Sequence, residues 1–473
     1  GGVGGGMADK LAKYRGKRDP ERTPEPVPGA GPLPEGNDDT FVIQEHHARR
    51  LHWDVRLERG GVLVSWAVPK GLPLDPKTNH LAVHTEDHPL EYASFEGSIP
   101  HGEYGGGKVV IWDRGRYVTE KWTPREVKVV FDGSRASGRY VFFQIREGDW
   151  MVHRMDPPPR PDWQPVPVGI KPMRPTVGQL PPADQDAAWG FEMDWGGEPA
   201  IVVVDGGRAR VEVSGADQTT RYPELRALGA TLGSQVCVLG GTLVVLDPHG
   251  RPSAARLKER REASARQIQR RSGIAPVTFL VTDLIHLDGQ DTTPLPYEER
   301  RRLLEEFLPA GPNWHMSPTI AGGPDALAAS RDLGLRGIVA KRLDSTYRPG
   351  RRTDDWLSIS NLPTLRVAIA GWLPPAAAED DHQIGGLILG VDNADGLAYA
   401  GVVRTGLTAA DRSELAGQLR RLVRKTPPFS TPPPDLADAH WVRPTLAGEV
   451  SYRDWGADGR LRRPTWLRRL PAG

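Results

Sequence analysis

The stretch FVIQEHHARRLHWDVRLE, residues 41–58, decides the fold of the first part of the chain. From residue 51 to residue 58 apolar and polar residues alternate strictly, which predicts a β-strand with one apolar face and one polar face. On the polar face, His52, Asp54 and Arg56 point the same way in steps of about 7 Å. Similar short runs, separated by Gly, Pro and Asp, follow up to about residue 156. This region is therefore predicted to form a small all-β barrel or sandwich.

The polar face of this strand is also a candidate metal site. His52 and Asp54 can close on one divalent ion, and His46, six residues upstream, could return as a third ligand. A set of two imidazoles and one carboxylate suits manganese, zinc or Fe(II). Arg56 beside such an ion would bind a phosphate oxygen through its planar guanidinium. The alternative is a solvated strand face that carries mixed charge.

A second strand-like run, LAVHTEDHPLEY at residues 81–92, adds to this candidate site. Its polar residues also alternate, so we expect them on one face, and the Gly-rich segment at residues 97–107 would let the backbone approach a ligand. Two such strands in one small domain favour a metal and phosphate site over a solvated surface. The side chains concerned are His84, Glu86, His88 and Tyr92, with Lys70 as a further cation.

Length and composition limit the rest of the interpretation. The 473 residues suggest roughly three domains at about 150 residues each. The 61 Lys and Arg nearly balance the 60 Asp and Glu, which excludes a protein coated in basic charge but not a local basic groove. The single cysteine, Cys237, excludes an intramolecular disulfide and a Cys-based zinc site. No apolar run reaches 18 residues, so we expect no membrane span.

Changes in composition along the chain predict five segments. A polar arm rich in Gly and Pro comes first and is predicted to be flexible. A Pro-rich linker separates the all-β region from an α+β region, in which strands alternate with helical patterns, and a β-barrel of about 100 residues ends the chain. The predicted boundaries are 1–38 for the arm, 39–156 for the all-β domain, 157–185 for the linker, 186–362 for the α+β domain and 363–473 for the last barrel.

The N-terminal motifs resemble the 3'-phosphoesterase domain of the bacterial end-joining DNA ligase D family. The resemblance covers about residues 14–156 and rests on FVIQEHHARRLHWDVRLE, SWAVPKG, EDHPLEY and FEGSIPHGEYGGG, with YRGKRDPERTPEP matching the N-terminal arm of that domain. It implies manganese as the metal and DNA 3' ends as the substrate. In this chain it implies metal ligands at His46, His52 and Asp54; phosphate contact or catalysis by Arg56, Lys70, His88 and Tyr92, supported by Glu86; and substrate binding by Arg18, Asp19, Glu25 and His84.

The reaction that this resemblance implies is metal-assisted phosphoester cleavage. The metal would polarise a phosphate oxygen, while Arg56 and Lys70 neutralise the developing charge. His88 is the best candidate acid or base, because an unperturbed imidazole titrates near neutral pH. His80 stands where the family commonly has an arginine, which would weaken one phosphate contact. The product would be a 3'-hydroxyl that a ligase can seal.

Two later regions resemble ATP-dependent DNA ligases of the same kind. The segments VLGGTLVVLDPHGRP at 238–252 and GIVAKRLDSTYRPGRRTDDWL at 337–357 are similar to the nucleotidyltransferase domain, and YAGVVRTGL at 399–407 and GRLRRPTWLRRL at 459–470 are similar to the OB domain. The resemblance covers about residues 168–473. It implies an α+β nucleotidyltransferase domain followed by an OB-fold β-barrel.

The residues that perform ligation are nevertheless missing. Ligation needs a lysine whose amine attacks the α-phosphate of ATP, and the aligned segment WGFEMDWGGEPA at 189–200 has Asp194 at that position. A carboxylate cannot form the adduct and would repel the triphosphate. Lys341 survives, which leaves open whether it keeps a role or is an ordinary surface lysine. The other departures are Thr242 for an acid, Thr282 for an aromatic, Arg336 for an acid, and Ser358 and Ser360 for two lysines.

The sequence therefore predicts a manganese-dependent DNA 3'-end-processing hydrolase that acts in non-homologous end joining and does not use ATP. Its ligase-like half would hold DNA or a repair partner such as Ku. Residues 251–271, whose pattern indicates a helix, carry eight Lys and Arg against two Glu. This segment is either a phosphate-binding surface or a solvated helix face. An active ATP-dependent ligase and a non-catalytic DNA-end scaffold are the alternatives. We expect a cytoplasmic protein, associated with the nucleoid when bound to DNA.

Overall fold

The computed structural model describes residues 9–376 and 383–471, so the first eight residues of the predicted arm lie outside the described residues. The chain divides into two compact units, which are described separately. Unit 1 holds the residues up to Arg174 together with Trp195–Pro318 and Arg342–Arg352; unit 2 holds Pro175–Asp194, Thr319–Lys341 and the residues from Thr353 onward. No helix in the described parts of the chain is long and apolar enough to cross a membrane.

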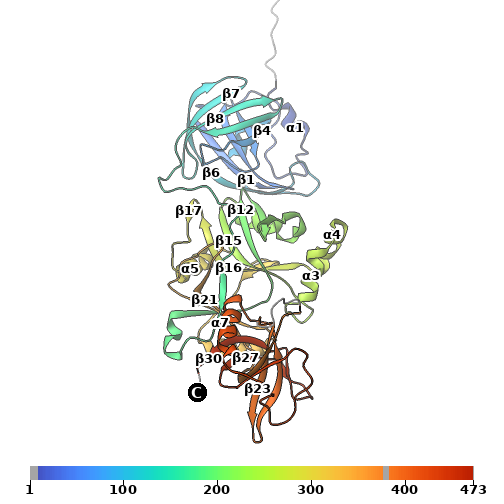
Figure 1. Ribbon diagram of the computed structural model, residues 1–473. Coiled ribbons are helices and arrows are strands. Elements are labelled where there is room, and N and C mark those ends of the chain that lie inside the picture. Colours follow the sequence, from blue (N-terminus) through green and yellow to red (C-terminus); the bar gives the residue numbers. More distant parts are fainter. Residues whose placement is uncertain (1–8, 377–382, 472–473) are drawn as a thin grey trace, which may run out of the picture. The chain divides into compact units, whose positions relative to one another are not determined.

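Eight antiparallel strands of unit 1 close into a barrel, drawn in blue and cyan in Figure 1. Strand β1 pairs with both β2 and β6 and thereby closes the ring, and the short β5 pairs with β6. This barrel confirms the predicted all-β domain. The eight barrel strands are β1 (Thr40–His47), β2 (Leu51–Arg59), β3 (Val62–Val68), β4 (His80–Pro89), β6 (Gly107–Trp122), β7 (Glu126–Gly133), β8 (Ser137–Arg146) and β9 (Asp149–Arg154), and the additional strand is β5 (Gly97–Ile99).

The apolar residues of β2 face the interior of the barrel, and this determines which side chains of the strand point outward. Trp53, Val55 and Leu57 of β2 are at most 2% exposed and lie in the apolar core with Trp66 and Phe142. Burial of each such side chain contributes about 1.5–3 kcal/mol, and a slip of one residue would expose all three. The register in which His46 pairs with His52 is therefore strongly specified. The polar residues of β2 are held on the opposite face, as the alternation predicts.

A second apolar cluster covers part of that opposite face. It contains Tyr14 from helix α1 (Ala12–Gly16), Val42 of β1, Leu63 of β3 and Tyr92 of the 3₁₀-helix η1 (Leu90–Ser94). Tyr14 is fully buried there. The prediction that the arm is flexible is therefore wrong for the stretch around Tyr14, because its ring is covered by the barrel.

The rest of unit 1 contains the larger part of the predicted α+β domain. Its main sheet has the order β14-β13-β12-β15-β16-β17, with β18 pairing β16 in parallel. Residues 251–271 form two helices rather than one, because Ser264 begins a new helix with a capping box. The elements are β12 (Glu198–Asp205), β13 (Arg208–Val213), β14 (Ala216–Asp217), α2 (Arg226–Leu232), β15 (Cys237–Val245), α3 (Ala254–Glu262), α4 (Ala265–Ile274), β16 (Val277–Leu287), β17 (Gln290–Asp291), α5 (Tyr297–Phe307) and β18 (Trp314–Met316).

Unit 2 contains a five-stranded sheet and the C-terminal OB-like barrel. The first sheet consists of β10 (Arg174–Val177), β21 (Arg352–Ser360), β20 (Gly337–Arg342), β11 (Trp189–Met193) and β19 (Thr319–Ile320), in that order, with α6 (Gly323–Asp332) beside it. The barrel, drawn in orange and red in Figure 1, confirms the predicted last domain. It consists of β22 (Thr364–Leu373), β23 (Gly386–Asn393), β24 (Gly396–Val403), α7 (Ala409–Arg420), β25 (Val423–Arg424), β26 (His440–Val442), β27 (Ala447–Ser451) and β30 (Thr465–Leu470).

Candidate active site

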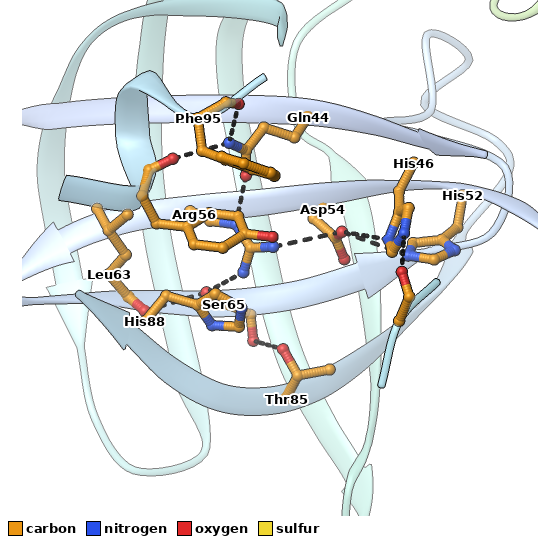
Figure 2. A network of polar contacts seen from close by, with 12 residues as sticks. Gln44, His46, His52, Asp54, Arg56, Leu63, Ser65, Thr85, His88 and Phe95 are labelled. Carbon is orange, nitrogen blue, oxygen red and sulfur yellow. Dashed lines mark hydrogen bonds and ion pairs between the residues drawn. The ribbon is translucent and has the colours of Figure 1, made fainter. Parts of the chain in front are cut away.

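Two histidines and one aspartate meet on the polar face of the β1–β2 hairpin. The Nδ1 atom of His46 lies 3.5 Å from Oδ2 of Asp54, and the Nε2 atom of His52 lies 3.3 Å from the same oxygen. One ligand atom from each residue lies within 4.8 Å of the other two. Figure 2 shows the two imidazoles side by side, both facing the carboxylate. The structure thus brings together the three side chains predicted as metal ligands.

Backbone carbonyls fix which nitrogen each imidazole turns toward Asp54. The Nε2 atom of His46 lies 2.7 Å from the carbonyl oxygen of Gly105, and the Nδ1 atom of His52 lies 3.1 Å from that of Arg50. Because a carbonyl only accepts hydrogen bonds, these nitrogens carry the protons. The other nitrogen of each ring keeps its lone pair, as metal-binding histidines require. Gly105 has φ of +71°, which favours glycine in the loop that supplies one carbonyl.

The charges at this site favour the ionised form of the Asp54 carboxyl. Burial alone would raise the pKa of Asp54, but the nearby Arg56 and His52 hold it well below its usual value. Burial alone would lower the pKa of His52, but Asp54 raises it. The resulting donor set of two nitrogens and one carboxylate oxygen fits manganese, zinc or Fe(II).

Arg56 is held in the middle of the site by three partners (Figure 2). Its Nε donates to Oε1 of Gln44 at 2.7 Å, its Nη1 donates to Oγ of Ser65 at 2.9 Å, and its Nη2 lies 3.4 Å from Oδ2 of Asp54. These contacts use three of the five guanidinium N–H groups and leave two that could bind a phosphate oxygen. The guanidinium also lies 4.8 Å from the ring centre of Tyr92.

Gln44 and Ser65 are residues of the candidate site that the sequence analysis missed. Gln44 is fully buried, and its Nε2 donates to the carbonyls of Tyr92 and Phe95, so its Oε1 is turned toward Arg56. The signal was present in the sequence: Gln44 alternates with His46 on one strand, and Ser65 is the polar residue within the apolar run VLVSWAV. A buried polar residue in an apolar strand needs a hydrogen-bonding partner.

Replacement of Gln44 by Leu is expected to lower phosphoesterase turnover by about ten- to a hundredfold, because Arg56 would lose the acceptor that orients its guanidinium. Turnover of a 3'-phosphate primer checks this. Gln44→Glu keeps an acceptor for Arg56 but loses the donor to two carbonyls, so it should lie between Leu and wild type. Equal turnover of Gln44→Leu and wild type would show that Arg56 needs no such support.

His88 is poised as a neutral imidazole. Its Nδ1 lies 2.9 Å from the carbonyl oxygen of Glu86, so Nδ1 carries the proton and Nε2 keeps a lone pair. Burial, then the positive charges of Arg56 and Arg18, hold the pKa of His88 well below its usual value. At neutral pH the ring is therefore neutral, with a proton on Nδ1 alone, which favours the role of proton acceptor among the two that the sequence analysis allowed.

The N-terminal arm supplies further charged groups. The Nε atom of Arg18 lies 3.1 Å from Oε1 of Glu25, and its Nη1 lies 3.5 Å from Oε1 of Glu86. The hydroxyl of Tyr92 donates to Oε2 of Glu25 at 2.6 Å. Four residues predicted from widely separated segments, Arg18, Glu25, Glu86 and Tyr92, are thus joined by direct contacts.

The enclosed site has one side that is more open. Arg56 and His88 are 4% exposed or less, whereas the His52 side chain is 22% exposed. Lys70 is exposed and lies near His80, and among the described residues no hydrogen bond or ion pair joins it to the network around Arg56. Asp19 is also exposed and accepts the backbone N–H of Glu21.

His84 does not share a face with His88, contrary to the prediction from alternation. A register shift between Leu63 and Ser65 marks a bulge in the β3–β4 pairing. An extra residue in one strand reverses the alternation beyond it. The ring centre of His84 lies 5.1 Å from that of Trp66 and 5.4 Å from that of Trp150, and the His84 side chain is exposed at this end of the barrel. Its Nδ1 lies 2.9 Å from the backbone carbonyl oxygen of Ser65, so His84 borders the candidate site through that main-chain group.

In unit 2, the position of the ligase lysine is taken by an ion pair of reversed charge. Oδ2 of Asp194 lies 2.9 Å from Nε of Arg336, and the backbone N–H of Asp194 donates to the carbonyl of Gly337. The two positions that the sequence analysis aligned with a lysine and an acid of the family thus hold an acid and a base, which neutralise each other across neighbouring strands. Arg336 is 70% exposed and Asp194 15% exposed, so the pair lies near the surface of unit 2.

Lys341 is not a surface lysine. It is buried, its Nζ lies 2.5 Å from Oε2 of Glu192, and it lies 4.0 Å from the ring centre of Trp356.

The other four positions at which the sequence departs from the ligase motifs make local hydrogen bonds. Ser360 in unit 2 accepts the backbone N–H of Leu362 through its hydroxyl oxygen. In unit 1, the hydroxyls of Thr242 and Thr282 donate to the backbone carbonyls of Glu198 and Gly240. Ser358, in strand β21, contributes its backbone carbonyl to a bond with Gly178.

Comparisons with known protein families match all three domains. Residues 44–144 match the family described as DNA Ligase D 3'-phosphoesterase domain. Residues 184–359 match the ATP dependent DNA ligase domain, and residues 380–470 match the ATP dependent DNA ligase C terminal region. These matches follow the order that the sequence motifs indicated.

Individual relatives agree with the family matches. The multifunctional non-homologous end joining protein LigD of Mycobacterium bovis is 42% identical over 97% of this chain and 60% of its own length. DNA ligase C2 of Mycolicibacterium smegmatis is 32% identical over 52% of this chain and 69% of its own length. The crystal structure of the ligase domain from M. tuberculosis LigD is 34% identical, with a TM-score of 0.40, over 64% of this chain and 95% of that domain. The chain thus spans 60% of the length of the LigD relative.

Proposed function

Because the chain belongs to the ATP-dependent DNA ligase family, in the LigD branch that carries a 3'-phosphoesterase domain, we propose that it processes DNA 3' ends in non-homologous end joining. The N-terminal barrel removes a 3'-phosphate or a 3'-terminal ribonucleotide and leaves a 3'-hydroxyl. Manganese is the proposed metal. The ligase-like half does not form an adenylated lysine and contributes DNA binding.

The observation that carries this proposal is the convergence of His46 Nδ1, His52 Nε2 and Asp54 Oδ2 next to the buried Arg56. A divalent ion held by these three residues would polarise a phosphate oxygen. The two remaining N–H groups of Arg56 neutralise charge that develops on the phosphate, in a site where burial strengthens the interaction. His88, neutral at pH 7, would accept a proton from the attacking water, the bond from phosphorus to the 3'-oxygen would break, and that oxygen would take up a proton to become the 3'-hydroxyl.

The substrate approaches from the side of His52, the most exposed of the three proposed ligands. The arm side chains Arg18 and Glu25 lie behind the site with Tyr92, so their proposed role is to support the wall that faces the 3'-terminal nucleotide. Lys70, which is exposed, would have to reach the phosphate when DNA binds.

The test is a DNA primer that ends in a 3'-phosphate, incubated with the full chain and with Mn²⁺ or EDTA. We expect a 3'-hydroxyl with Mn²⁺ and none with EDTA, read by extension of the product with a DNA polymerase. Folded protein that forms no 3'-hydroxyl with Mn²⁺, Zn²⁺ or Fe²⁺ would refute the phosphoesterase proposal. Activity that is equal with and without EDTA would refute the metal site.

The ligase-like half is proposed to bind DNA through its basic surfaces. On α4, Arg266 and Arg270 are exposed and one helical turn apart, and Lys258 is exposed on α3. Such a surface would track phosphates without regard to sequence, with an affinity that falls as salt rises. DNA ends are the proposed partner, and other end-joining proteins such as Ku are proposed to recruit the chain.

A further inference from the structure

The imidazole of His88 is enclosed by aromatic rings from two segments of the chain. The ring of Tyr92 lies 4.7 Å from it at an interplanar angle of 83°, and the ring of Tyr14 lies 5.0 Å from it at 65°. Tyr92 follows strand β4 directly, whereas Tyr14 comes from the N-terminal arm, 74 residues upstream of His88. The barrel strands alone therefore provide only part of the wall around this imidazole.

Both rings are needed to fix the plane of the imidazole. The hydrogen bond from Nδ1 to the carbonyl of Glu86 fixes one ring nitrogen, and the motion that remains is rotation of the ring about its Cβ–Cγ bond. Edge-to-face contacts with two aromatic rings define the plane, because each favours one relative orientation. The direction of the Nε2 lone pair, which would accept the proton, follows from that plane.

Tyr14 is itself held rigidly. Its hydroxyl donates to the carbonyl of Pro26 at 2.5 Å, and the guanidinium of Arg18 lies 3.8 Å from its ring centre. Arg18 is bound by Glu25, and Glu25 also accepts the hydroxyl of Tyr92. One buried carboxylate thus ties together the two aromatic rings that enclose His88.

We infer that Tyr14 is a positioning residue for His88, so that the N-terminal arm forms a wall of the reaction site. Tyr14 acts through its ring, which orients the His88 imidazole, and does not touch the substrate. This inference rests on the proposed phosphoesterase function. The coverage that Tyr14 provides also contributes to the burial that lowers the pKa of His88.

The test compares three variants of the full chain with the 3'-phosphate primer and Mn²⁺. Tyr14→Ala removes the ring, Tyr14→Phe keeps the ring but loses the bond to Pro26, and Ile99→Ala opens the same apolar cluster while both rings that contact His88 remain. We expect Tyr14→Ala to lower kcat by about ten- to a hundredfold with less than about a threefold change in KM. Tyr14→Phe should rescue most of the loss, and Ile99→Ala should stay within about threefold of wild type.

A second measurement does not depend on activity. In protein with ¹⁵N-labelled histidines, with the His88 signals assigned by His88→Gln, wild type should show one His88 tautomer, protonated at Nδ1. In Tyr14→Ala the ¹⁵N chemical shifts of Nδ1 and Nε2 should move toward each other, because a ring that turns loses its bond to Glu86 and exchanges between the two tautomers. In Ile99→Ala these shifts should stay as in wild type. Unchanged His88 signals in Tyr14→Ala, or a kcat no lower than in Ile99→Ala, would overturn the inference. An inactive wild type with the expected signals would refute the proposed function alone.

Discussion

Replacement of His52 by Ala is expected to lower 3'-phosphate removal by at least about a thousandfold, the largest effect of any single change in the barrel. His52 contributes the Nε2 atom that lies 3.3 Å from Asp54, and its loss leaves one imidazole and one carboxylate, too few to hold the ion in place. Release of the 3'-phosphate at saturating Mn²⁺ measures the effect. The barrel should stay folded, because His52 is on the face opposite to the apolar core.

His84→Ala is the matched control for this prediction. It removes the same side chain from the same barrel, but the ring of His84 contacts Trp66 and Trp150 rather than the metal-binding side chains. Its activity should stay within about threefold of wild type. If His84→Ala lost as much activity as His52→Ala at equal folded content, the assignment of the site to the β1–β2 face would be wrong. Circular dichroism of both variants verifies their folded content.

The wild-type chain is expected to leave no labelled AMP on itself when incubated with labelled ATP and Mg²⁺ or Mn²⁺. Asp194 stands where the sequence motif places the ligase nucleophile, and a carboxylate cannot form the lysine–AMP phosphoramidate. Asp194 is in addition neutralised by Arg336 at 2.9 Å. Gel electrophoresis of the denatured protein detects the adduct. A labelled band would contradict the loss of ligase activity, and its absence in Lys341→Arg would then identify Lys341 as a relocated nucleophile.

Variants of the reversed ion pair separate its structural effect from its chemical one. Asp194→Lys places two cations together and should lower the stability of unit 2 by up to about 1 kcal/mol, since exposed pairs contribute little. The double variant Asp194→Lys with Arg336→Glu should recover that stability, as read from thermal unfolding midpoints. Neither variant should form the adduct, because Thr242, Ser358 and Ser360 still replace groups that the family uses. An adduct on the double variant would show that those replacements are tolerated.

The alternation of residues 51–58 was sufficient to predict the barrel strand and the face that carries His52, Asp54 and Arg56. Side-chain direction along a strand has a period of two. A register shifted by one residue would expose Trp53, Val55 and Leu57, so their burial specifies the register. The same local rule failed for His84, because a bulge in the β3–β4 pairing reverses the alternation. Whether a strand contains a bulge depends on its partner, which the strand's own sequence does not reveal.

Contacts between distant segments were decided only by the tertiary structure. In the sequence, Gln44 and Ser65 show no sign of a shared partner. In the structure both accept hydrogen bonds from Arg56, which is 12 residues from Gln44 and 9 residues from Ser65 along the chain. Lys341 is an isolated lysine in the sequence, but strand pairing and burial place it against Glu192 and Trp356. A buried ammonium group without a partner would lower the stability of the fold severely, and Glu192 is the partner that avoids this cost.

The sequence by itself determined which chemical groups this protein has and which it has lost. Asp194, at the position aligned with the ligase nucleophile, predicts that no lysine adduct forms there, and the order His46, His52 and Asp54 predicts metal ligands on one hairpin, because local covalent order and strand periodicity act over a few residues. Only the tertiary structure decided which nitrogen of each imidazole is available, that His88 is kept neutral, and that Tyr14 of the arm lies against it. Those properties depend on burial and on partners far along the chain, and no local pattern encodes them.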